Sequence, residues 1–140
     1  MKQKFMKRLI VIVTSISLFL LSCERQAEWQ YFLNNQSDYR VHLGIDVWGS
    51  DTTITIESHE LKLFHHDSAW GNAVDFEELF LNDFDTIFVN IEEPMHVNKN
   101  IHLRENWEFE IIGGNKYADG GTAVYTFIID NTHISQDTKK

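Results

Sequence analysis

Apolar and polar residues alternate with a period of two over much of the chain, which is the pattern of half-buried β-strands. The clearest run spans residues 39–47, where five apolar side chains are separated by polar residues or glycine: Tyr39, Val41, Leu43, Ile45 and Val47. The same alternation places Ile54 with Ile56 on one face, and later Ile87 with Val89 and Ile91. We expect these apolar faces to form the core of one domain.

Further strands are predicted for residues 29–33, 61–66 and 107–111. Residues 123–129 are apolar on both faces, which is typical of a central strand covered on both sides. Between the runs lie short polar segments, such as Asn34–Asp38, whose residues favour turns. We also expect a loop at 67–75 and one or two helical turns at 76–81.

Seven or eight short strands with almost no helix predict an all-β fold. An antiparallel β-sandwich, immunoglobulin-like or transthyretin-like, is favoured over a small barrel because several strands have one polar face. The expected organisation is a signal peptide at 1–22, a tether at 23–28, the sandwich at 29–134 and a polar tail at 135–140.

The N-terminal segment has the composition of an export signal. Four basic residues, Lys2, Lys4, Lys7 and Arg8, precede an apolar run from Leu9 to Leu21. That run has 13 residues, which is too short to span a bilayer as a helix.

The signal is followed at once by Cys23, the only cysteine in the chain. The residues Leu20-Leu21-Ser22-Cys23 resemble the lipobox of bacterial lipoproteins. This resemblance implies cleavage before Cys23 and acylation of both its thiol and its new amino group. Several acyl chains would anchor the protein stably, whereas one chain would not. Since Glu24 is not an aspartate, analogy with enteric lipoproteins favours the outer membrane.

The charge of the chain restricts its partners. All 21 acidic residues lie after the signal, whereas four of the 12 basic residues lie within it. The net charge of the cleaved chain is therefore more negative than the −9 of the whole chain. Such a chain is repelled by phosphate backbones and by anionic lipid headgroups. We therefore expect no nucleic-acid partner, and membrane attachment through lipid alone.

Three stretches of the chain resemble small single-domain lipoproteins of the Bacteroidota. They are a polar turn before an alternating strand at 34–47, a strand bounded by acidic residues at 85–93, and a Tyr-Thr strand with an acidic end at 125–130. His133 lies near the place where such proteins often have a tyrosine. The resemblance implies a β-sandwich of undefined function in the cell envelope.

The sequence predicts neither a metal site nor a catalytic site, and no cofactor. His65 and His66 are adjacent, so on an extended strand they point to opposite faces and cannot bind one ion. Glu77, Glu78 and the pair Asp83 and Asp85 fit a solvated acidic surface, and no nucleophile or phosphate-binding motif is present.

Four tryptophans offer the most specific hypothesis about binding. Trp29 and Trp107 lie in strand patterns and are predicted to pack in or at the edge of the core. Trp48 falls on the polar side of its strand, and Trp70 lies beside Gly71 in the expected loop. Exposed rings of this kind bind glycans and proteins. The alternative for Trp70 is a loop that folds back and buries the ring over the sheet.

Three short Asp-Ser/Thr motifs match the O-glycosylation signal of exported Bacteroidota proteins, at Thr52, Ser68 and Thr86. Ser68, in the expected loop, is the most accessible of the three by this reasoning. The chain is thus predicted to be a lipid-anchored, non-catalytic envelope protein that binds a glycan or a protein partner. The alternative is an envelope enzyme or enzyme inhibitor that uses an acidic cleft.

Overall fold

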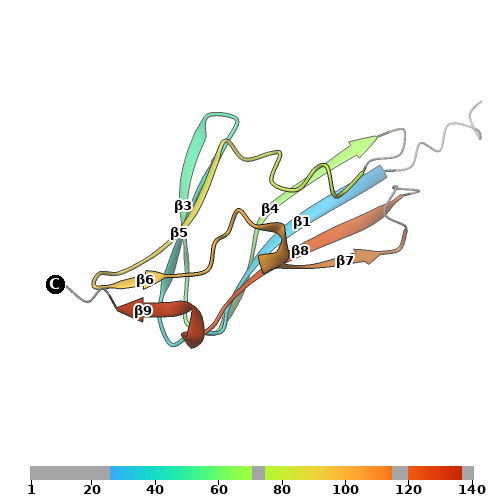
Figure 1. Cartoon of the computed structure of the whole chain (residues 1–140). Helices are drawn as coiled ribbons and strands as arrows, with labels where there is room; N and C mark the ends of the chain where they lie inside the picture. Colours follow the sequence, from blue (N-terminus) through green and yellow to red (C-terminus); the bar gives the residue numbers. More distant parts are fainter. Residues whose placement is uncertain (1–25, 71–74, 115–119, 137–140) are drawn as a thin grey trace, which may run out of the picture.

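The computed structural model describes residues 26–70, 75–114 and 120–136. Within these ranges the chain forms nine strands and two short 3-10 turns (Figure 1). In chain order the elements are β1 (Gln26–Asn35), β2 (Val41–Val47), β3 (Ser50–Ile56), β4 (Glu60–Trp70), β5 (Thr86–Ile91), β6 (Met95–Val97), η1 (Arg104–Asn106), β7 (Trp107–Ile112), β8 (Gly121–Ile129), η2 (Asn131–His133) and β9 (Ile134–Gln136).

The strands form a four-stranded sheet of order β4-β1-β8-β7, a three-stranded sheet of order β3-β2-β5, and a small β6-β9 pair. All pairs are antiparallel except β1 with β8. Figure 1 shows the two larger sheets meeting near the turns that connect β1 to β2 and β3 to β4, and diverging from there. The predicted all-β sandwich is confirmed, and no helix in the described part of the chain could span a bilayer.

The core follows from the period-two alternation. Tyr31 and Leu33 of β1 face Tyr125 and Phe127 of β8, and all four are fully buried. The two tyrosine rings stack with centroids 4.8 Å apart. The other sheet contributes the inward residues of its three strands, of which the most buried are Val41, Leu43, Ile45, Ile56 and Ile87. As predicted, Trp29 and Trp107 are also buried.

Two expectations about individual strands are wrong. Tyr39 is exposed because β2 starts only at Val41, after the turn. The expected loop at 67–75 is a continuation of β4 up to Trp70, because its backbone pairs with the first residues of β1, with Gln26 opposite Trp70.

Residues 75–85 form hydrogen-bonded turns rather than the expected helical turns. A single bond from the Leu79 N–H to the Asp75 carbonyl has helical spacing, and Leu81 then takes a φ of +58°, which a continuing helix does not allow. The Tyr31 hydroxyl donates to the Leu79 carbonyl and accepts from the Leu81 N–H. The Tyr125 hydroxyl donates to the Phe76 carbonyl.

These two tyrosines act as neutral hydrogen-bonding groups. Burial disfavours the charged phenolate, and it raises the pKa of Tyr125 to about 12 and that of Tyr31 further. Both hydroxyls therefore keep their protons at any physiological pH. The polar ends of two core rings thus fix the segment 75–85 to the four-stranded sheet.

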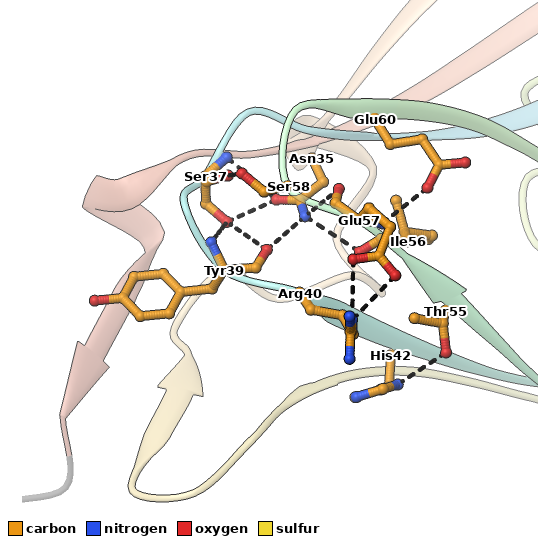
Figure 2. A network of polar contacts seen from close by, with 10 residues as sticks. All are labelled: Asn35, Ser37, Tyr39, Arg40, His42, Thr55, Ile56, Glu57, Ser58 and Glu60. Atoms are coloured by element: carbon orange, nitrogen blue, oxygen red, sulfur yellow. Dashed lines mark hydrogen bonds and ion pairs between the residues drawn. The ribbon is translucent and has the colours of Figure 1, made fainter.

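A buried polar network joins the two connections between the sheets (Figure 2). Asn35 and Ser37 are fully buried. The Asn35 amide nitrogen donates to the carbonyls of Tyr39, at 2.7 Å, and Glu57, at 2.9 Å, while its oxygen accepts from the Ser37 hydroxyl at 2.6 Å. The Ser58 hydroxyl donates to the Ser37 carbonyl at 2.8 Å. The turn after β1 is thereby tied to the turn after β3.

Replacing Asn35 with alanine should lower the free energy of unfolding by about 2 to 4 kcal/mol, because it removes a fully buried amide that hydrogen-bonds to the Tyr39 and Glu57 carbonyls and to the Ser37 hydroxyl. Asn34→Ala is the matched control, since Asn34 is only half-buried and lies on the opposite face of β1; it should cost less than about 1 kcal/mol. Denaturant unfolding of both variants measures the difference. Equal costs would show that the network does not stabilise the fold.

Candidate functional site

A groove of about 350 Å³ lies on the outer face of the three-stranded sheet. Its walls come from two neighbouring rows of residues that face away from the core. In one row Gly44 lies between Thr53 and Phe88, and in the next Asp46 lies between Asp51 and Thr86. The intervening residues Ile45 and Thr52 complete the lining.

The floor of the groove exists because Gly44 has no side chain. A Cβ atom at this position would lie 2.1 Å from the Cζ atom of Phe88. The Phe88 ring therefore extends across Gly44, and 45% of the residue stays exposed. Packing on a strand glycine is one reason for this position of the ring. Its exposed surface is also available to a ligand.

The polar wall of the groove carries two carboxylates with the same charge. Asp46 and Asp51 are directly opposite one another on β2 and β3, an arrangement that weakens strand pairing. The Oδ1 atom of Asp46 is buried and has no hydrogen-bond partner within the described part of the chain. A buried acceptor without a partner is costly.

Trp48 occupies the turn that closes the β2–β3 hairpin above the two aspartates. The turn has two residues, with φ of +53° for Trp48 and +78° for Gly49, and positive values at both positions define a type I′ turn. Asparagine, aspartate or glycine is the usual first residue of such a turn, and a tryptophan there is strained. Its ring gains no burial in return, since 74% of the residue is exposed.

The segment 75–85 supports this turn from the side. The Gly49 N–H donates to a carboxylate oxygen of Asp85 at 3.2 Å, and the Asp85 N–H donates to the Asp46 carbonyl at 2.9 Å. Asp85, predicted to lie on a solvated surface, is exposed, and it also positions the hairpin.

Trp70 is 67% exposed, so the alternative in which a loop buries the ring is wrong. It lies at the end of β4, in the other sheet from Trp48. The end of β4 and the tip of the β2–β3 hairpin are well separated in Figure 1. The two exposed tryptophans therefore do not form one site.

The structure also places the other predicted residues. Thr52 and Thr86 are exposed and line the groove. Ser68 lies within β4 opposite Glu28 and is only half-exposed, so its expected position in a loop is wrong. Modification of all three stays a prediction. Cys23 and the signal peptide lie outside the described residues.

Asp46, Asp51 and Phe88 were not identified by sequence reasoning. Gly44 was the available signal, because an isolated glycine inside a strand often marks a close approach of another group.

A second set of polar side chains converges inside the sandwich. His65 and Asp67 of β4 and Asp83 of the segment 75–85 each offer one ligand atom, and these atoms lie within 4.8 Å of one another. They could hold a metal ion. Glu77 and Glu78, by contrast, are exposed.

No protein-family model matches the sequence, and searches of curated proteins and of solved structures likewise found no match. The site must therefore be interpreted from its own geometry. That geometry is a groove with an aromatic floor and two opposed carboxylates, on a hairpin whose turn carries the exposed, strained Trp48.

Replacing Trp48 with asparagine should raise the free energy of unfolding by about 1 kcal/mol, because Asn-Gly is the preferred pair in a type I′ turn. Trp70→Asn is the control: it also removes an exposed ring, but Trp70 has no positive φ, so no gain is expected. Thermal and denaturant unfolding compare the two variants. A loss of stability in Trp48→Asn would show that the ring packs on the hairpin and is not strained.

Proposed function

We propose that this chain is an exported, lipid-anchored domain that binds a carbohydrate in the groove of its three-stranded sheet. The observation that carries this proposal is Trp48, an exposed ring in a strained turn that begins two residues after Asp46 of the groove. Strain of this kind persists where it serves a function, and the ring does not contribute to the core.

The groove has the chemistry that a sugar ring needs. The faces of Trp48 and Phe88 can stack on the C–H face of a pyranose, since aromatic rings bury a large area at little entropic cost. Asp46 and Asp51 can accept hydrogen bonds from hydroxyl groups, and the hydroxyls of Thr53 and Thr86 can both donate and accept. Apolar contact with a few oriented polar groups is typical of small-molecule sites.

The lipid anchor would place one end of the four-stranded sheet near the bilayer. Only two residues, Glu24 and Arg25, separate Cys23 from the start of β1 at Gln26. Trp70 is paired with Gln26 and is therefore at the same end of the sheet. A tryptophan at the level of the lipid headgroups can bury its apolar ring while its N–H bonds to polar groups. A position at the membrane surface would therefore account for the exposure of Trp70 without a ligand.

A second function has one observation in its favour. The facing carboxylates of Asp46 and Asp51 lie in a groove, as do the paired acids of glycosidases. The binding experiment distinguishes the two functions, because an enzyme would release shortened products from a glycan that a binding domain leaves intact.

The test of binding begins with a glycan array and the purified full chain. For a glycan retained on the array, Trp48→Asn should weaken binding by about 1 to 3 kcal/mol while the fold stays intact, and so should Asp46→Asn. Trp70→Asn should bind like the original protein. Calorimetry measures the affinities, and chromatography of the recovered glycan detects cleavage.

Two results would contradict the carbohydrate proposal. One is the absence of any glycan that binds the full chain. The other is an equal affinity for Trp48→Asn and the original protein, which would place the ligand elsewhere.

The anchor is tested separately with Cys23→Ser. We expect the precursor to stay uncleaved and unlabelled by radioactive palmitate, whereas the original chain is cleaved and labelled. Membrane fractionation of cells that produce the variant should then detect the precursor and no mature protein. Equal palmitate labelling of both proteins would rule out acylation at Cys23.

A further inference from the structure

We infer that His65, Asp67 and Asp83 form a binding site for a divalent transition-metal ion inside the sandwich. This site is independent of the groove and of the carbohydrate proposal, because its residues come from β4 and from the segment 75–85 on the core side of the four-stranded sheet.

A β-bulge in β4 directs two of the ligands inward. Leu63 is opposite Phe32 and His65 is opposite Tyr31, so that Phe64 is an extra residue without a partner on β1. Because the strand is regular again after the bulge, His65 and Asp67 lie on the same face. The side chain of His65 is only 12% exposed, whereas that of the next residue, His66, is 47% exposed.

The third ligand comes from a distant part of the sequence. Asp83 lies in the segment that Tyr31 and Tyr125 fix to the sheet, and its side chain is also 12% exposed. Its Oδ2 atom lies 3.0 Å from the Nε2 atom of His65. Ligand atoms on one metal ion with bonds of about 2.0 to 2.2 Å are separated by a similar distance.

The surroundings have further features of a metal site. The indole N–H of Trp29 donates to Asp83 Oδ2 at 2.5 Å, and such a second hydrogen bond orients a carboxylate ligand. The ring of Phe84 packs edge-on against that of His65 with centroids 4.8 Å apart, which restricts the imidazole. One side of the cluster is therefore apolar and the ligands have little freedom.

The ion pair between His65 and Asp83 does not explain the whole cluster. Asp67 also has a carboxylate oxygen within 4.8 Å of both, and it accepts a hydrogen bond from the N–H of the next residue, Ser68. Two carboxylates beside one imidazole form a negatively charged cluster, which a bound cation would neutralise.

The ligand set restricts the choice of ion. An imidazole nitrogen with two carboxylate oxygens suits Zn²⁺ and neighbouring first-row ions, whereas Mg²⁺ and Ca²⁺ prefer oxygen ligands alone. Water would complete the coordination. A bound ion would link β4 to the segment 75–85 and would therefore also stabilise the fold.

The test uses the purified full chain without a histidine tag, stripped of metal by EDTA and titrated with Zn²⁺ in a calorimeter. We expect saturable binding of one ion per chain and a melting temperature that rises with the Zn²⁺ concentration. Asp67→Asn should weaken binding at least tenfold. This variant keeps the His65–Asp83 pair, so it should fold like the original protein.

His66→Gln is the matched control, because it removes the adjacent histidine on the opposite face of the same strand. It should leave the affinity and stoichiometry unchanged. The inference is wrong if Zn²⁺ does not bind at one site, or if Asp67→Asn binds as tightly as the original protein. Weaker binding in His66→Gln than in Asp67→Asn would also overturn it, since the ion would then lie on the outer face.

Discussion

One buried amide, that of Asn35, fixes the geometry at the end where the two sheets meet. The chain passes between sheets twice there, from β1 to β2 and from β3 to β4, and the carbonyls of Tyr39 and Glu57 in these passages lie outside the strands. The amide nitrogen donates to one carbonyl from each passage, and the amide oxygen accepts from Ser37. A side chain with both a donor and an acceptor is needed, which explains the polar Asn-Asn-Gln-Ser turn inside an apolar domain.

At the end where the sheets diverge, the segment 75–85 fixes the geometry, as the Asn35 network does at the other end. It has no regular secondary structure, and it is held by side-chain contacts: the two tyrosine hydroxyls, the pairing of Asp83 with Trp29 and His65, and the bond from Asp85 to the hairpin. The same segment thus carries Asp83 to the proposed metal site and Asp85 to the turn of Trp48. The two proposed sites share one support, although they lie on different faces.

The alternation along the sequence predicted much of the fold and little of either site. A period of two identifies which residues share a face, so the core positions of β1, β2 and β8 follow directly. It cannot predict a bulge, and it is the bulge at Phe64 that lets the adjacent residues Phe64 and His65 both contribute to the interior. Nor does it bring Asp83 to His65, since that contact depends on how a segment without periodicity packs. The exposure of Trp70 likewise follows from the pairing of the end of β4 with β1. The polar residues around Trp70 favour a turn, so the sequence pattern predicted a loop there and not a strand.

The β2–β3 hairpin is where local preference and observed structure disagree most. Gly44 weakens the centre of a strand, Asp46 faces the like charge of Asp51, and Trp48 takes a backbone conformation that suits asparagine. Each departure costs stability, and all three lie in one hairpin. Conflicts of this kind gather at functional sites, because selection for binding tolerates what selection for stability removes. The hairpin is therefore where we place the proposed binding site.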